Sequence, residues 1–161
     1  MKLSHILSTV AVTTLLSFVG ACSSTGPGPN VKSDEGVQFN LSQCELLNNE
    51  FHCQLTIMSE HQNASLEIKN NTKLIDDQGN EYPLTAGSVA SLEIKNDMYA
   101  KVQKELTAGS PVNATFIFEN IATSAKSVKE LIVAGRIKIH NHVTWEDYDV
   151  TLKAPPQEEN K

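Results

Sequence analysis

Cys44-Glu-Leu-Leu-Asn-Asn-Glu-Phe-His-Cys53 is the stretch that decides the fold. Its two central asparagines, Asn48 and Asn49, tolerate the left-handed backbone conformation that a two-residue type I′ turn needs at both positions. Counting outward from that turn pairs Leu47 with Glu50, Leu46 with Phe51, Glu45 with His52, and Cys44 with Cys53. The cysteines then form a non-hydrogen-bonded pair with Cα atoms roughly 4.5 Å apart, at the short edge of the disulfide range. The stretch therefore predicts a tight hairpin that a Cys44–Cys53 disulfide can close.

The hairpin also predicts an irregularity upstream. Cys44 and Leu46 share a face with Phe51 and Cys53, whereas the apolar residues before them, Val37, Phe39 and Leu41, occupy odd-numbered positions. Because side chains alternate strictly along a strand, a change from odd to even positions requires an extra residue. We expect a bulge or break near Ser42-Gln43.

Alternation with a period of two continues through the rest of the chain. Apolar residues alternate with polar ones in short segments, at Phe51–Ile57, Ala64–Ile68, Leu92–Ile94, Val112–Phe118, Ile137–Ile139 and Tyr148–Leu152. Turn-forming residues separate the segments, at Asn48-Asn49, Asn70-Asn71, Asp77–Asn80, Thr85–Ser88 and Ala108–Pro111. Many short alternating strands in about a hundred residues indicate an all-β antiparallel sandwich or barrel. We place this domain at residues 37–154.

Two local features stand apart from the strand pattern. Residues Ser124–Glu130 combine a possible Ser cap with good helix formers, which predicts one short helical turn. Ala64–Asn70 recurs identically as Ala90–Asn96, and Leu84–Ser88 recurs as Leu106–Ser110. The two offsets differ, which argues against a solenoid and favours reused strand and turn chemistry.

The N-terminus has the layout of an export signal. Lys2 precedes an uncharged, apolar run from Ile6 to Ala21, which is shorter than the ~20 apolar residues that a transmembrane helix needs. The run ends in Val19-Gly-Ala-Cys22, which resembles a bacterial lipobox. The resemblance implies cleavage after residue 21 and a lipid-bearing Cys22, and Ser23 after it is typical of sorting to the outer membrane. We expect a signal peptide at residues 1–21 and a membrane anchor at Cys22.

Residues 22–36 lack core-forming side chains and read as a flexible tether, and residues 155–161 read as a disordered tail. The chain has 13 basic and 19 acidic residues, and loss of Lys2 with the signal leaves a net charge of about minus seven. Such a domain is a poor electrostatic match for phosphate backbones, so nucleic acid is not an expected partner.

The order Cys44, Cys53-x-Leu-x-Ile, Leu74–Tyr82 and Leu106–Val112 leading into Phe116-Ile-Phe resembles the immunoglobulin-like domains of many uncharacterised bacterial lipoproteins. The resemblance implies an immunoglobulin-like sandwich and says little about activity, because the shared motifs are structural. Trp145 lies after both cysteines, so the antibody-type Cys-Trp-Cys order is absent.

No combination of residues forms a recognisable catalytic or metal site. His140 and His142, with Asp147 and Asp149 nearby, lack a third ligand at diagnostic spacing. Asp76–Glu81 resembles a calcium loop only superficially, and a hairpin with Gly79 at positive φ explains it better. Glu146, Asp147 and Asp149 could hold a carboxylate pair, but their alternation with Tyr148 and Val150 indicates the solvent face of a strand. We expect no cofactor and no metal.

Export to an oxidising compartment favours a structural disulfide over thiol chemistry at Cys44 and Cys53. We therefore expect a lipid-anchored periplasmic or outer-membrane lipoprotein that is not an enzyme and acts as an interaction or envelope-accessory module. Its partners would be the membrane, through the lipid on Cys22, and an envelope protein. Two alternatives stay open, a periplasmic inhibitor of a cell-wall-degrading enzyme and a hydrolase with an unrecognised site.

Overall fold

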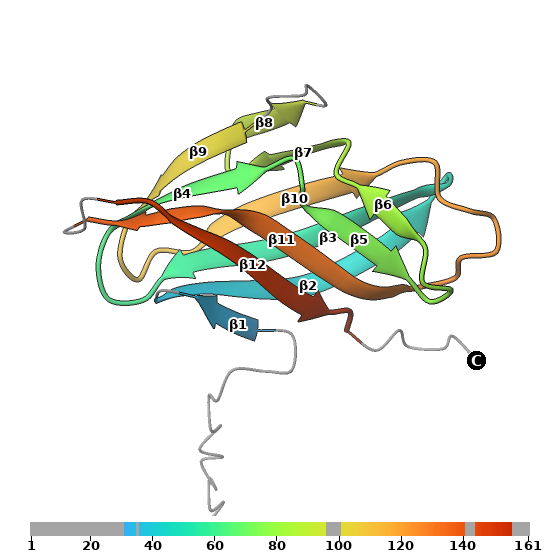
Figure 1. The fold of residues 1–161 in the computed structure, drawn as a ribbon, viewed down its shortest axis with the longest axis horizontal. Coiled ribbons are helices and arrows are strands. Elements are labelled where there is room, and N and C mark those ends of the chain that lie inside the picture. The colour runs from blue at the N-terminus through green and yellow to red at the C-terminus, as the bar shows by residue number, and fades with distance from the viewer. Residues whose placement is uncertain (1–30, 35, 96–100, 141–143, 156–161) are drawn as a thin grey trace, which may run out of the picture.

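The computed structural model describes residues 31–34, 36–95, 101–140 and 144–155, which form two antiparallel sheets packed face to face (Figure 1). Sheet A has the strand order β1 (Val31–Asp34), β2 (Val37–Leu47), β3 (Glu50–Ser59), β10 (Val112–Phe118), β7 (Ala86–Val89) and β8 (Leu92–Lys95). Sheet B has the order β6 (Glu81–Pro83), β5 (Lys73–Asp76), β11 (Val128–Ile139), β4 (Ala64–Lys69) and β9 (Lys101–Leu106), and β12 (Glu146–Lys153) pairs with β11. The predicted all-β sandwich is confirmed.

The core lies between the sheets and consists of the alternating apolar residues. Sheet A contributes its four phenylalanines, Phe39, Phe51, Phe116 and Phe118, each at most 1% exposed. The ring of Phe39 lies 5.2 Å from that of Tyr148 in sheet B, centroid to centroid. The period of two read from the sequence thus separates core from surface in both sheets.

The β2–β3 hairpin has the predicted register. Asn48 and Asn49 have φ values of 51° and 65°, and Cys44 pairs with Cys53. Leu46 pairs with Phe51 as expected, but Leu46 is 40% exposed, whereas Phe51 is buried in the core.

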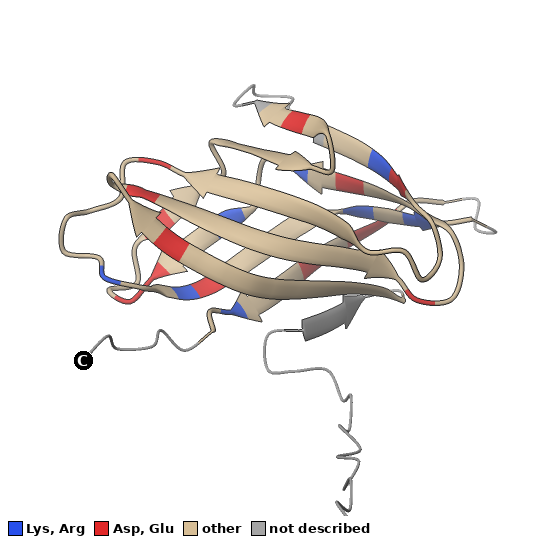
Figure 2. Ribbon diagram, turned by 180° about the vertical axis from the view of Figure 1, so that it is seen from behind, with Lys and Arg blue, Asp and Glu red and all other residues tan. Residues whose placement is uncertain are grey.

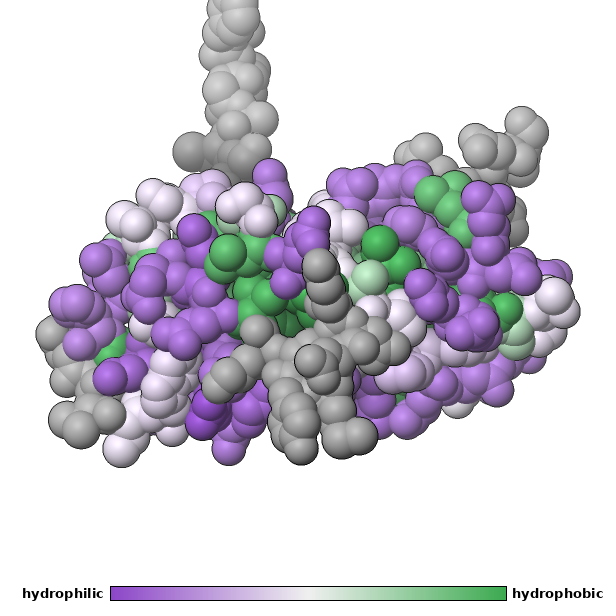
Figure 3. Space-filling model, turned by 90° about the horizontal axis from the view of Figure 1, so that it is seen from above, coloured by the Kyte–Doolittle hydropathy of each residue, from purple (hydrophilic) through white to green (hydrophobic). Residues whose placement is uncertain are grey.

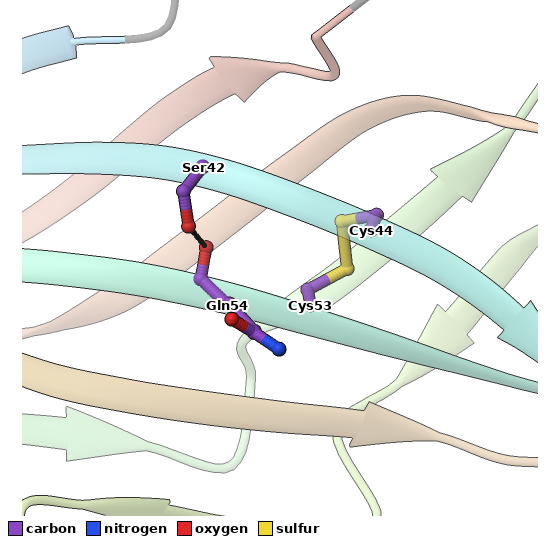
Figure 4. Close-up of a disulfide and its surroundings, with 4 residues drawn as sticks. All are labelled: Ser42, Cys44, Cys53 and Gln54. Carbon is purple, nitrogen blue, oxygen red and sulfur yellow. Dashed lines mark hydrogen bonds between the residues drawn. A yellow bond between two sulfur atoms is a disulfide. The ribbon is translucent and has the colours of Figure 1, made fainter. Parts of the chain in front are cut away.

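The predicted bulge in β2 is also confirmed. Leu41 pairs with Leu55 and Gln43 with Gln54, which leaves Ser42 as the extra residue. The Ser42 hydroxyl donates a hydrogen bond to the Gln54 carbonyl oxygen at 2.9 Å (Figure 4). The bulge lets apolar residues at odd and then even positions face the same core.

The prediction of a helical turn at Ser124–Glu130 is wrong. Among the described residues there is no helix, and this segment holds only a turn closed by the hydrogen bond from Ala125 N to Ala122 O, after which β11 begins at Val128. The backbone N–H groups of Lys126 and Ser127 donate to the Asp77 carboxylate. Contacts to a distant turn therefore override the local helix preference.

The turn expected at Thr85–Ser88 is a strand, β7. Gly87 pairs with Phe116, and a Cβ built on it would lie 2.3 Å from the Thr115 carbonyl oxygen. Glycine here permits close approach of two backbones and does not mark a turn. In the second copy of the same pentapeptide, Gly109 has φ +70° and forms the turn that was expected.

Sheet A begins earlier than expected. β1 lies within residues 22–36, whose composition predicts a tether, and its residues Val31–Asp34 pair with Asn40–Val37 of β2. Backbone pairing needs no apolar pattern, which is why composition did not reveal this strand.

Sheet B forks where β4 passes into β5. Both strands pair with the same edge of β11, but Ile68 pairs with Gly135 and Lys73 with Ile132, so four residues oppose two. The Thr72 hydroxyl fills the gap, since it accepts a hydrogen bond from Ala134 N at 3.1 Å and donates one to Ala134 O at 3.3 Å. Beyond the fork, β4 leads to β9 and β5 leads to β6 (Figure 1).

Replacing Thr72 by valine should destabilise the fold by about 2–3 kcal/mol, because the buried N–H and C=O groups of Ala134 lose their partner while the side-chain shape is kept. Thr72→Ser retains the hydroxyl and should recover most of that loss. Urea unfolding of the two variants measures the difference. Equal midpoints for the valine and serine variants would contradict a bridging role.

Candidate functional site

The predicted disulfide is present. The Sγ atoms of Cys44 and Cys53 are 2.04 Å apart and the Cα atoms 4.0 Å apart, and both residues are buried. The bridge joins neighbouring strands next to the Ser42 bulge (Figure 4). Its burial fits a structural role.

Replacing both Cys44 and Cys53 by alanine should lower the free energy of unfolding by about 2–3 kcal/mol, because the bridge closes a short loop. Thermal unfolding with and without reductant measures this effect in the unmodified chain. Mass spectrometry after alkylation without reductant should find no label on these two residues. Labelling of both in protein taken from an oxidising compartment would contradict the bridge.

The other sequence-derived candidates do not converge. Cys22 and His142 lie outside the described residues, and the backbone N–H of His140 donates to Asn63 O at the end of β11. Within the described ranges, no group of three His, Cys, Asp or Glu side chains is placed to hold a metal ion. No helix long and apolar enough to cross a membrane occurs in the same ranges.

The turn that resembled a calcium loop is an internal hydrogen-bond cluster. Gly79 has φ +88°, as expected for a hairpin. The buried Asp76 carboxylate accepts hydrogen bonds from Gln78 N, Asn80 N, Asn80 Nδ2 and Tyr82 Oη, at 2.8–2.9 Å. Burial alone would raise the pKa of Asp76, but these hydrogen bonds outweigh it and lower the pKa. The carboxylate therefore serves as the acceptor that orders the turn.

Tyr82 extends this cluster to the segment before β11. Its hydroxyl donates to Asp76 and accepts a hydrogen bond from Ala122 N at 3.2 Å. Burial raises the pKa of Tyr82, and the Asp76 carboxylate adds to the rise, so the hydroxyl keeps its proton. The cluster is structural.

The outer face of sheet B carries paired charges. The buried Glu67 carboxylate accepts two-pronged hydrogen bonds from Arg136, whose guanidinium lies 5.4 Å from the Trp145 ring centroid. Lys69 Nζ lies 2.6 Å from the Asp147 carboxylate, and this hydrogen bond, with the Lys69 and Arg136 charges, lowers the pKa of Asp147. Asp147 and Asp149 alternate with buried Tyr148 and Val150, so the predicted solvent face is confirmed.

The outer face of sheet A is different, because its centre has no charged residue. The outward side chains of β2, β3, β10 and β7 there are amides, hydroxyls and one thioether, which we call the uncharged face: Gln38, Asn40, Gln54, Thr56, Met58, Ser88, Asn113 and Thr115. Viewed from behind, the middle of this face carries no charge colour, and charged residues lie towards its ends (Figure 2).

The uncharged face is made of rows that cross the strands. Asn40, Thr56 and Asn113 form one row, and Gln54, Thr115 and Ser88 form the next. Two hollows lie along it. One, of about 330 Å³, lies around Gln54 and Thr56, and the other, of about 520 Å³, lies around Ser88 and Thr115 and is bounded by Glu93 of the edge strand β8.

Sequence reasoning did not find this face, although a signal was present. The polar positions between the apolar ones in Val37–Leu41, Gln54–Ile57 and Val112–Thr115 are all uncharged. Only the register of the three strands shows that these positions are neighbours.

Exposed apolar surface offers no competing site. In the described part of the chain, the exposed large hydrophobic side chains are Leu46, Leu47 and Leu92. The first two lie at the hairpin end and the third on the edge strand β8. Seen from above, green hydrophobic residues are interrupted by hydrophilic ones (Figure 3).

A second hollow region lies at the fork of sheet B. This fork groove has a volume of about 700 Å³ and is lined by outward side chains that include Asn71, Lys73, Pro83, Ile132, Asp149 and Thr151. Lys73 Nζ lies 2.8 Å from the Glu81 carboxylate, so this wall of the groove has no net charge.

No protein-family model matches the chain, and no curated protein is significantly similar to it in sequence.

Proposed function

We propose that the chain is a lipid-anchored lipoprotein of the bacterial envelope that acts as a non-enzymatic interaction module and binds an envelope protein through the uncharged face. The anchor rests on Lys2, the apolar run Ile6–Ala21 and the Val19-Gly-Ala-Cys22 motif. Outer-membrane attachment facing the periplasm is the location that Ser23 favours.

The observation that carries the proposal is the absence of charge on the centre of sheet A. Charged residues are depleted in the buried core of protein–protein interfaces, because their desolvation costs free energy that only well-placed partners return. Amides and hydroxyls can both donate and accept hydrogen bonds, so rows of them can pair with a protein surface.

The composition of this face also predicts a modest affinity. Binding hot spots are enriched in Trp, Tyr and Arg, and the uncharged face has none of these. Attachment to a shared membrane offsets a weak contact, because it raises the effective concentration of one partner near the other. The membrane anchor and the uncharged face therefore both support binding to another protein of the envelope.

The interface is tested by a matched pair of substitutions, Gln54→Lys at the centre of the uncharged face and Gln103→Lys on the exposed side of β9 in sheet B. A photo-crosslinking residue at Thr56 in the living host should yield a discrete adduct with an envelope protein. Gln54→Lys should reduce this adduct at least about tenfold, since an unpaired lysine would be buried, and Gln103→Lys should leave it unchanged. Equal loss with both lysines, or no adduct, would count against this face.

The anchor is tested separately. Cys22→Ser should remove the protein from the membrane fraction and abolish the mass added by acyl chains, because the thiol that carries the lipid is gone. Cys44→Ser is the control, since it alters a cysteine and keeps Cys22. Unchanged fractionation and mass of the Cys22 variant would overturn the anchor and leave the interface test standing.

A further inference from the structure

We infer that the fork groove is a binding site for a primary ammonium group on an aliphatic stem, with Asp149 as its counterion. The site lies on sheet B, away from the uncharged face, and does not depend on the anchor. Its basis is that two cross-strand charge pairs of β12 and β11, Asp147 with Arg136 and Lys153 with Glu130, are separated by two rows without a pair, and that Asp149 in the first of these rows has no cation opposite it.

The charge pairs before and after Asp149 on β12 show that Asp149 itself lacks a cation. Two residues before it, Asp147 is opposite Arg136 and within 2.6 Å of Lys69. Four residues after it, Lys153 is opposite Glu130. Asp149 is opposite Ala134, and within the described residues it has no hydrogen bond or ion pair. It is the carboxylate on this face of β12 that has no cation.

The space beside Asp149 is built into the fold. Ala134 contributes only a methyl group, and the bulge at the fork puts the buried Thr72 hydroxyl next to Ala134 in place of an outward side chain. The hollow persists because Thr72 satisfies both backbone groups of Ala134 from within the sheet. A volume of about 700 Å³ falls in the usual range of small-ligand sites.

The lining fits an ammonium on a carbon chain. An ammonium group has three N–H donors, and the groove offers the Asp149 carboxylate, the Thr151 hydroxyl and the Asn71 amide oxygen as acceptors. Ile132 and Pro83 supply apolar surface for a methylene stem. Lys73 does not repel the ligand strongly, because Glu81 neutralises it at 2.8 Å.

Two sources carry this chemistry, a lysine side chain of a polypeptide and a free diamine. The test uses the chain without residues 1–21 and with Cys22→Ser, because the described core lies wholly within residues 37–152. It is titrated with Nα-acetyl-lysine amide, with 1,5-diaminopentane and with the uncharged Nα-acetyl-norleucine amide, and the backbone amide signals are followed by NMR. Binding by the lysine amide assigns the site to polypeptides, and binding by the diamine alone assigns it to free amines.

The expected result is a saturable shift of the Asn71, Asp149 and Thr151 signals with an ammonium probe and none with the norleucine amide. Asp149→Asn should weaken binding roughly fivefold, the worth of an exposed ion pair. Asp147→Asn is the matched control, since it makes the same change on the same face of β12 outside the groove, and should leave the affinity unchanged. Equal weakening by both variants, binding of the norleucine amide, or no saturable shift would overturn the assignment.

Discussion

Gly135→Ala is expected to destabilise the sandwich by at least about 4 kcal/mol, which is enough to prevent accumulation of folded protein. Gly135 lies in β11 between Ile68 of β4 and Tyr148 of β12. A Cβ at this position would lie 1.9 Å from the Glu67 carbonyl oxygen and 2.6 Å from Tyr148 Oη. The first contact is with backbone, so β4 would have to move away from β11.

Chemical denaturation and yield of folded protein measure this effect, and Gly109→Ala is the control. Gly109 has φ +70°, but a Cβ at this position would have no neighbour within 4 Å, so alanine there should cost only about 1 kcal/mol of backbone strain. A similar loss at both positions would contradict the clash with Glu67 and Tyr148 as the dominant effect at Gly135, which does not have a positive φ.

Asp76→Ala is expected to cost about 3–5 kcal/mol. It removes the acceptor for the backbone N–H groups of Gln78 and Asn80, the Asn80 amide and the Tyr82 hydroxyl. Each donor left without a partner in a buried setting costs about 1–3 kcal/mol, and water can reach only some of them. Loss of the turn should also loosen the segment that Tyr82 holds through Ala122 N. Hydrogen exchange at Ala122 measures that second effect, and unchanged protection there would contradict the link.

The same carboxylate predicts a pH dependence. Because the pKa of Asp76 is lowered in the folded protein, its contribution is fully present above the ordinary value of 3.8 and is lost as the pH falls through the lower folded value. Stability should therefore decline below about pH 4. Asp76→Asn should flatten this decline without removing it, because the pKa values of Asp77 and Asp147 are also lowered. Urea midpoints between pH 2 and 6 test it, and parallel profiles for the two proteins would contradict the assignment.

The parts of the fold that the sequence predicted are those where turn chemistry and hydrophobic period agree. Asn48-Asn49 set the register of the β2–β3 hairpin, and the shift from odd to even apolar positions located the Ser42 bulge. Both signals are local, so they do not depend on which strands pair elsewhere.

Identical sequences show why the rest could not be predicted. Leu84–Ser88 leads into strand β7, whereas Leu106–Ser110 leaves strand β9 and turns at Gly109. The difference comes from Thr115 and Phe116, which lie against Gly87 and are remote in sequence. The helix expected at Ser124–Glu130 fails for the same reason, since Asp77 binds its backbone N–H groups. Tertiary contacts decided these segments.

The candidate sites were harder to predict from the sequence than the fold, because they depend on which residues are neighbours across strands. Gln54 and Thr115 are ordinary polar residues until the register places them side by side. In the sequence, Asp149 is an ordinary polar position of a strand. Only the register shows that Ala134 lies opposite Asp149, whereas the cationic Arg136 lies opposite Asp147.

The pairing of β1 with β2 limits how far the domain can reach. If Cys22 is the anchor, as proposed, residues 23–30 are the only link to the sandwich, since Val31–Asp34 already belong to sheet A. Eight residues span at most about 27 Å, against about 48 Å for the fourteen residues of 23–36. The domain would then be confined to a thin layer next to the bilayer. Its effective concentration in that layer would be roughly twofold higher than with a tether of fourteen residues. Binding partners in that layer would be favoured over partners deeper in the periplasm. Separation of β1 from β2 would lengthen the tether and extend this reach.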